Sequence, residues 1–202
     1  MKRIIILMLM LVLVTGCSLK NMFVRENKVI EYLTGKHNVE IKVKDYGIIK
    51  VELDADTAPI TVTNFIELVN EKFYDGLTFH RIIEGFMIQG GDPDANGTGG
   101  SDETIKGEFI ANGIPNSISH TRGVISMARG GDDYDSASSQ FFIMHKDYTS
   151  LDGYYAAFGH VTDGMKVVDK IAKITSEPDS GFVDYNRQPV IEYIKVIENN
   201  QE

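Results

Sequence analysis

The residue of this chain best suited to chemistry is an arginine set among apolar side chains. Arg81 lies in a strand-like run, and Phe86, Met87 and Gln89 follow shortly after it. Side chains alternate between the two faces of a strand, so Met87 and Gln89 share one face and Phe86 lies on the other. Met87 and Gln89 can then line one surface together with Arg81. Arginine donates hydrogen bonds without giving up its proton. The alternative is a surface arginine whose stem covers a hydrophobic core, and residue composition alone favours that alternative.

Other catalytic and metal-binding patterns are missing from the sequence. No two of the five histidines have the spacing of metal ligands on one element, and no cysteine joins them: His37, His80, His120, His145 and His160. The serine hydrolase motifs G-x-S-x-G and S-x-x-K are absent. The glycine-rich stretch 90–100 lacks the lysine of a phosphate-binding loop, so its glycines are expected to serve sharp turns. We therefore expect neither a metal nor a cofactor.

The elements that must position Arg81 are mostly short strands. Alternating apolar residues on both sides of a turn at 45–47 predict a β-hairpin that begins at Val39. Further strands are predicted from short apolar stretches bounded by turn residues, at 78–83, 86–89, 123–128, 141–145, 156–161 and 190–197. One helix is predicted with Asp56 as its capping residue and helical spacing up to Phe73, and a second over 165–174. Many strands with two helices predict a closed or nearly closed β-barrel.

The first residues have the composition of a secretion signal. Lys2 and Arg3 precede an uncharged apolar run that is shorter than the roughly 20 residues needed to span a bilayer. Residues 1–16 are therefore predicted to be a signal peptide. The sequence Val-Thr-Gly-Cys at 14–17 resembles a bacterial lipobox, which makes Cys17 the expected lipid attachment site. The alternative is an incidental thiol beside an ordinary cleavage site.

The rest of the chain is interpreted as a tether followed by one domain. Residues 17–38 are polar and are expected to lift the domain from the membrane, and residues 39–202 form the domain. The formal charge of −9 disfavours binding to nucleic acid or to anionic headgroups. We expect an extracytoplasmic monomer that is lipid-anchored to the bacterial cell membrane and carries no disulfide, because Cys17 is the sole cysteine.

Three ordered blocks of sequence resemble the cyclophilins. The first is Phe-His-Arg-Ile-Ile at 79–83 followed by Gly-Phe-Met-Ile-Gln-Gly-Gly-Asp at 85–92. The second is Gly-Val-Ile-Ser-Met-Ala-Arg at 123–129, with Ser-Ser-Gln-Phe-Phe-Ile at 138–143. The third is Leu-Asp-Gly at 151–153, followed by Phe-Gly. The resemblance extends over residues 39–197, which is essentially the whole predicted domain.

The resemblance implies a closed eight-stranded antiparallel barrel, capped by two helices, with a substrate groove on its outer face. It implies that Arg81 is the catalytic group. It also implies an apolar pocket for the proline ring, formed by Phe86, Met87, Phe142 and Leu151. Further substrate-binding or positioning residues would be Gln89, Ala128, Arg129, Gln140 and Tyr155. The chain departs from the family at Ser150, where many members have tryptophan, and at Tyr155, where the pocket often has histidine.

The implied activity is peptidyl-prolyl cis-trans isomerisation. Rotation about an X-Pro bond is slow because it must break amide resonance, at a cost of roughly 18–20 kcal/mol. A donor beside the prolyl nitrogen stabilises the twisted state, in which that nitrogen regains a lone pair. The expected partners are proline-containing segments of exported proteins, whose folding the enzyme assists at the membrane surface. The alternative is a chaperone or adaptor that binds proline-containing peptides with little turnover.

Overall fold

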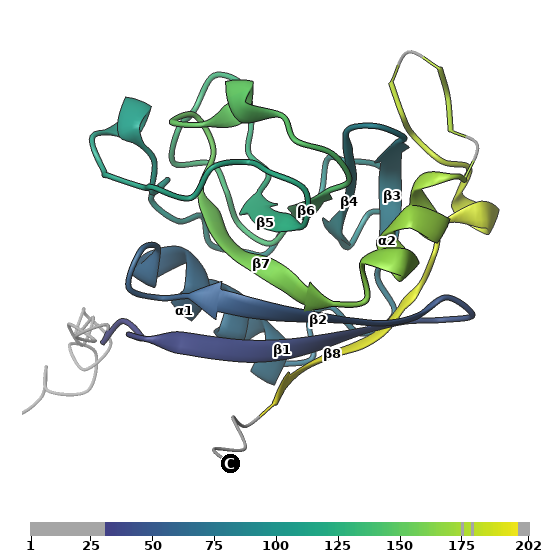
Figure 1. Cartoon of the computed structure of the whole chain (residues 1–202), viewed down its shortest axis with the longest axis horizontal. Helices are drawn as coiled ribbons and strands as arrows, with labels where there is room; N and C mark the ends of the chain where they lie inside the picture. The colour runs from purple at the N-terminus through teal and green to yellow at the C-terminus, as the bar shows by residue number, and fades with distance from the viewer. Residues whose placement is uncertain (1–30, 175, 179, 198–202) are drawn as a thin grey trace, which may run out of the picture. The chain divides into compact units, whose positions relative to one another are not determined.

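The computed structural model describes residues 31–174, 176–178 and 180–197. Within these residues, eight strands form one antiparallel sheet and two α-helices pack against it (Figure 1). The strands are β1 (Lys36–Val43), β2 (Gly47–Asp54), β3 (Thr78–Ile83), β4 (Met87–Asp92), β5 (Val124–Met127), β6 (Phe141–Met144), β7 (Ala157–Asp163) and β8 (Ile191–Ile197). The helices are α1 (Pro59–Asn70) and α2 (Met165–Ala172), and the 3-10 helices are η1 (Ile110–Asn112), η2 (Thr149–Leu151) and η3 (Tyr185–Arg187). The predicted signal peptide, Cys17 and most of the predicted tether lie outside the described residues.

The predicted first hairpin is confirmed. Val39 pairs with Val51 and Ile41 pairs with Ile49, and all four side chains are fully buried. Pairing begins at Lys36, ahead of the predicted start. The alternation of apolar and polar residues therefore fixes the register of β1 and β2, because a slip by one residue would expose the whole buried set.

The sheet is open, so the predicted closed barrel is wrong. Its strand order is β3-β4-β6-β5-β7-β2-β1-β8, which places β3 and β8 at its two ends. Among the described residues these ends meet through an isolated bridge between Thr78 and Val190, and no regular ladder joins them. The sheet curls without closing, and β1 and β8 run side by side at its lower edge in Figure 1.

The outer edge of β3 is occupied by residues 180–190, which we call the edge segment. The backbone N–H of Ile82 donates to the carbonyl of Gly181 at 2.7 Å, and the N–H of Val183 donates to the carbonyl of His80 at 2.9 Å. These bonds satisfy backbone groups of an edge strand that would otherwise need a partner. The edge segment thus replaces the ladder that would have closed the barrel.

Strands β5 and β6 are buried on both faces. In β6, Phe141 and Ile143 belong to the main core, whereas Phe142 and Met144 belong to a smaller apolar cluster on the opposite face. The main core includes closely packed aromatic rings, those of Phe65, Tyr74, Phe79, Phe141 and Phe158. Because both faces are buried, the sequence of β6 is an unbroken apolar run and lacks the alternation of a half-exposed strand. The smaller cluster forms the floor of the groove described below.

Helix α1 is capped by a glutamate that is distant in sequence. The carboxylate of Glu108 accepts hydrogen bonds from the backbone N–H groups of Ile60 and Thr61, at 3.1 and 2.8 Å, and from the Thr61 hydroxyl at 2.7 Å. Glu108 is almost fully buried. A negative charge at this end of a helix bonds the unpaired N–H groups and interacts favourably with the helix dipole. Glu108 thereby ties the loop after β4 to α1.

Two predicted details of α1 are wrong. Asp56 does not cap the helix, because the N-cap position is Ala58, which makes no side-chain capping bond. Phe73 lies beyond the helix, which ends at Asn70 before Lys72 takes a left-handed φ of 59°. Phe73 still packs against the core from the turn that follows, so its apolar spacing reflected burial and not helical structure.

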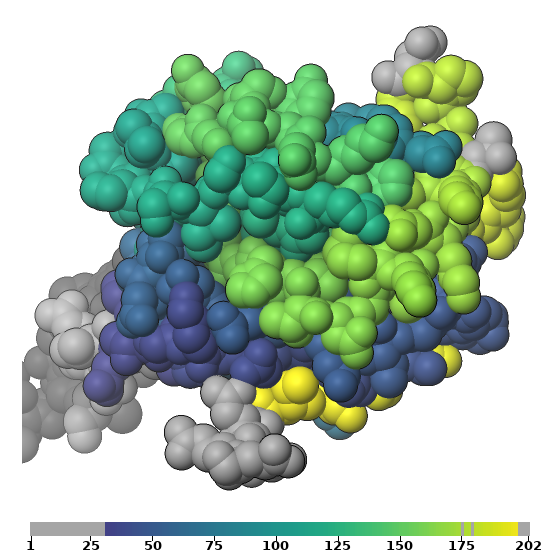
Figure 2. Space-filling model, in the orientation of Figure 1, coloured from purple at the N-terminus to yellow at the C-terminus, as the bar shows by residue number. Residues whose placement is uncertain are grey.

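Helix α2 has the predicted buried face, with Val168, Ile171 and Ala172 all inside. It contacts β2, β3 and β4, whereas α1 contacts β2 and β8. In the space-filling view, the first and last described strands meet at the lower surface, in purple and yellow (Figure 2). Among the described residues, no helix is long and apolar enough to span a membrane.

Candidate active site

A groove of about 290 Å³ lies over the smaller apolar cluster. Its lining consists of residues from β3, β4 and β6 and from the connecting loops: Arg81, Phe86, Met87, Gln89, Gly97, Ala128, Arg129, Phe142, Leu151, Tyr155 and Phe182. Met87 and Phe142 are almost fully buried and form its floor. The structure thus brings together every predicted binding residue except Gln140, although they come from well-separated parts of the sequence.

Gln140 lies in an adjoining hollow of about 420 Å³ that shares Gln89, Gly97, Ala128 and Arg129 with the groove. The Gln140 side-chain amide donates to the carbonyls of Gly97 and Gly99, at 3.1 and 2.8 Å. Its carbonyl oxygen accepts from the Gln89 side chain at 2.9 Å. Gln140 therefore acts on the groove through Gln89 and fixes the orientation of that amide.

The Arg81 guanidinium is held by two hydrogen bonds. Its Nη1 group donates to the Gln89 side-chain oxygen at 3.2 Å, and its Nε group donates to the Ser180 carbonyl at 2.8 Å. Nη2 makes no hydrogen bond to another described residue. Burial lowers the pKa of Arg81, but arginine remains charged in proteins. Within the described part of the chain, one nitrogen of this fixed cationic donor has no protein partner and lies beside an apolar floor.

Phe86 lines the groove although alternation along a strand would place it on the opposite face from Met87 and Gln89. It lies in the turn before β4, which begins at Met87, so strand alternation does not apply to it. Its ring packs against that of Tyr148, with centroids 4.7 Å apart. Tyr148 is half exposed and supports this wall of the groove, two residues before Ser150.

Arg129 is folded over aromatic rings at the rim of the groove. Its guanidinium carbon lies 4.8 Å from the centre of the Tyr155 ring and 4.9 Å from that of Tyr134. Its Nε group donates to the Tyr154 carbonyl at 3.0 Å. Cation–π contacts of this kind contribute about 0.5–1 kcal/mol at exposed sites. Arg129 therefore joins the loop after β5 to the loop that carries Tyr155.

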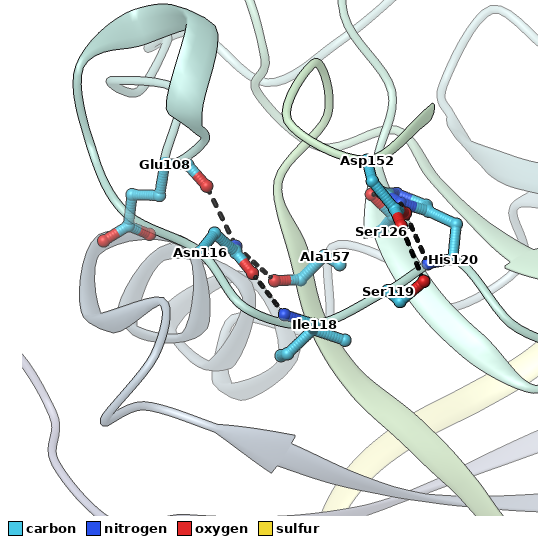
Figure 3. A network of polar contacts seen from close by, with 8 residues as sticks. All are labelled: Glu108, Asn116, Ile118, Ser119, His120, Ser126, Asp152 and Ala157. Carbon is cyan, nitrogen blue, oxygen red and sulfur yellow. Dashed lines mark hydrogen bonds and ion pairs between the residues drawn. The ribbon is translucent and has the colours of Figure 1, made fainter. Parts of the chain in front are cut away.

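A polar network near the floor of the groove is centred on His120, and Figure 3 shows this ring with Asp152 and Ser126. The His120 ring stands between Asp152 and Ser126, with Nδ1 at 2.9 Å from the Asp152 carboxylate and Nε2 at 3.0 Å from the Ser126 hydroxyl. The same ring stacks on Phe142 with 6.1 Å between centroids. Asp152 is adjacent to Leu151 in sequence, so His120 links the floor residue Phe142 to the loop that carries Leu151.

This serine, histidine and aspartate arrangement cannot work as a hydrolase triad. The Ser126 side chain is fully buried and does not line the groove, so its hydroxyl cannot reach a substrate. Burial lowers the pKa of His120, against the opposing effect of Asp152. A neutral ring satisfies both partners, because Nδ1–H donates to the carboxylate and Nε2 accepts from the hydroxyl. The network supports the shape of the site.

Phe182 and Gly97 were not predicted as site residues. Gly97 was interpreted as a turn glycine, and its φ of 93° agrees with that role. Phe182 lies in the edge segment, far from the three sequence blocks. The sequence offered one indication of its role: Phe182 is a single phenylalanine in the polar stretch between α2 and the last strand. No cluster of histidine, cysteine, aspartate or glutamate suited to a metal ion occurs in the described part of the chain.

Comparison with known proteins identifies the family. The model of the cyclophilin type peptidyl-prolyl cis-trans isomerase/CLD family matches residues 38–198. Peptidyl-prolyl cis-trans isomerase B of Bacillus subtilis is 48% identical over 124 residues, which cover 61% of this chain and 82% of the relative. The peptidyl-prolyl cis-trans isomerase of Helicobacter pylori strain 26695 is 47% identical over 127 residues, covering 62% and 74% of the two chains.

A similar fold is found in a solved structure. A cyclophilin type peptidyl-prolyl cis-trans isomerase of Cryptosporidium parvum, crystallised in the presence of the dipeptide Ala-Pro, is 30% identical with a TM-score of 0.71. The match covers 80% of this chain and 99% of the other. Together with the open antiparallel sheet and the Arg81 groove, these similarities place the chain in the family of cyclophilin-type peptidyl-prolyl cis-trans isomerases.

Proposed function

We propose that this isomerase accelerates rotation about X-Pro bonds in exported proteins at a bacterial membrane surface, with Arg81 as the catalytic donor. The proline ring would enter the apolar pocket formed by Phe86, Met87, Phe142 and Leu151. Proline-containing segments are the proposed ligands. The Ala-Pro dipeptide present with the Cryptosporidium parvum relative supports this choice.

The proposed mechanism needs no covalent intermediate. As the X-Pro amide twists, its nitrogen becomes pyramidal and regains a lone pair. A guanidinium N–H directed at this nitrogen stabilises the twisted state more than the planar ground state, which lowers the barrier. Because the donor is fixed before the substrate binds, little of this stabilisation is lost in reorienting it.

The observation that carries the proposal is the restraint of Arg81 at the edge of the apolar groove. Gln89 and the Ser180 carbonyl hold two of its nitrogens, and no other described residue bonds Nη2, which would be the donor to a ligand. Gln140 holds Gln89 in turn. A surface arginine with no role would not require this chain of amides.

The test is a proline-isomerisation assay on short peptides, with peptide binding measured separately by titration. We expect Arg81→Ala to lower kcat/KM on the order of 100-fold, the usual effect of removing a transition-state donor, with little change in peptide affinity. Arg187→Ala is the matched control, because Arg187 is exposed and lies outside the groove.

Each outcome of this assay has a distinct meaning. Full activity in Arg81→Ala would contradict the catalytic role of Arg81. A wild-type chain that binds peptides but does not accelerate isomerisation would point instead to a chaperone or adaptor. Loss of activity in Arg187→Ala as well would indicate a general loss of folding.

A further inference from the structure

The edge segment places an aromatic side chain beside Arg81. Phe182 and Arg81 are directly opposite each other in an isolated antiparallel bridge. Residues that face each other in an antiparallel pair project their side chains to the same side. Both side chains accordingly line the groove.

The Phe182 ring is fixed on two sides. It stacks on His80, with centroids 6.1 Å apart and planes 24° from parallel. A Cβ atom at Gly97 would come within 2.9 Å of the ring, so no larger residue fits there without displacing it. Phe182 is partly buried and lines the groove, so part of its ring is open to a ligand.

Phe182 lies outside the cluster proposed to hold the proline ring. That cluster consists of Met87, Phe142 and their apolar neighbours, and Phe182 does not belong to it. The bond on which Arg81 is proposed to act joins proline to the residue before it. A rigid aromatic surface next to Arg81 is therefore positioned for a residue adjacent to the proline.

We propose that Phe182 is a specificity-determining residue that contacts an apolar side chain adjacent to the substrate proline. This inference rests on the proposed function and adds a preference to it: peptides with a large apolar neighbour of proline are turned over faster than those with glycine. The Ser180 carbonyl, two residues earlier, holds Arg81, so the same segment would position the donor and select the substrate.

The test compares kcat/KM for peptides with glycine, alanine, leucine or phenylalanine before or after proline. In the intact wild-type chain, we expect large apolar neighbours to be favoured. Phe182→Ala should reduce kcat/KM for the leucine and phenylalanine peptides roughly tenfold and leave the glycine peptides nearly unchanged. Phe182→Tyr should keep the preference, because its ring is retained. Tyr185→Ala is the control, since Tyr185 belongs to the same segment, is 70% exposed and lies outside the groove.

An equal loss for all peptides in Phe182→Ala would overturn the inference and assign Phe182 a purely structural role. An unchanged preference would overturn it as well. If Phe182→Ala does not fold, the wild-type chain is titrated with the leucine peptides, and nuclear Overhauser effects between the Phe182 ring and the leucine methyl groups decide the question. Their absence at saturation overturns the inference. No turnover of any peptide by the wild-type chain would instead refute the proposed function.

Discussion

The orientation of Arg81 depends on neighbours that take no direct part in the proposed chemistry. Gln89 and the Ser180 carbonyl bond the guanidinium, and Gln140 fixes Gln89. An unrestrained arginine would sample many rotamers. Ordering it in the transition state would cost conformational entropy and reduce the stabilisation that it provides there. His80 and His120 are fully or almost fully buried and do not line the groove. We therefore expect them to affect stability more than chemistry.

We predict that these histidines make the domain less stable below neutral pH. Burial lowers the pKa of His80, with Asp92 opposing this shift and Arg81 adding to it, and burial also lowers the pKa of His120. As the pH falls below about 6.5, these two histidines bind protons more readily in the unfolded chain than in the folded chain. The free energy of unfolding should then fall by at most about 1.4 kcal/mol per pH unit for each histidine.

The measurement is urea unfolding at several pH values between 7.5 and 5, above the range in which carboxyl groups titrate. His80→Leu should flatten the pH dependence, because it removes one of the two titrating rings. Among the described residues, neither ring nitrogen of His80 has a hydrogen-bond partner that this change would remove. His160→Gln, a change at an exposed histidine, should keep the wild-type slope. A wild-type slope in His80→Leu would contradict the prediction for His80.

At the scale of elements, long-range polar contacts hold the loops around the sheet. Glu108 caps α1, Asp152 binds the backbone N–H of His120 at 2.7 Å, and the edge segment covers β3. The groove is made largely of loop residues on a rigid sheet, so its shape depends on these hydrogen bonds. Breaking a buried hydrogen bond lowers the free energy of unfolding more than breaking one exposed to water.

We predict that Glu108→Ala destabilises the domain by about 2–4 kcal/mol, because it leaves the buried N–H and hydroxyl of Thr61 and the partly buried N–H of Ile60 unpaired at the start of α1. Glu108→Gln should cost less, since its amide oxygen can still accept a bond. Denaturant unfolding measures both effects. Glu103→Ala, at an exposed glutamate in the same loop, should change stability by less than about 0.5 kcal/mol. Equal stability of Glu108→Ala and Glu103→Ala would refute the capping role.

At the scale of the whole molecule, we propose that a lipid on Cys17 attaches the enzyme to the outer face of the membrane. The signal-like first residues and the lipobox-like sequence at 14–17 support this proposal. The acidic chain, with a formal charge of −9, gains no electrostatic attraction to anionic headgroups. The lipid would therefore supply the membrane affinity.

We predict that Cys17→Ser abolishes membrane attachment without changing the isomerase activity of the domain. In detergent phase separation, the wild-type chain should partition into the detergent phase and Cys17→Ser into the aqueous phase. Ser18→Ala should behave like the wild type. Incorporation of a labelled fatty acid into Cys17→Ser, or its absence from the wild type, would contradict the lipid assignment.

The sequence by itself determined the register of the first hairpin, the buried face of α2 and the residue types of the groove. The register and the buried face follow from short-range periodicity, and the groove residues follow from the resemblance of three sequence blocks to the cyclophilins. Tertiary structure alone decided that the sheet stays open, that Glu108 and not Asp56 caps α1, and that Phe182 stands beside Arg81. Each of these depends on contacts between residues far apart in the chain, and local patterns carry no information about such contacts.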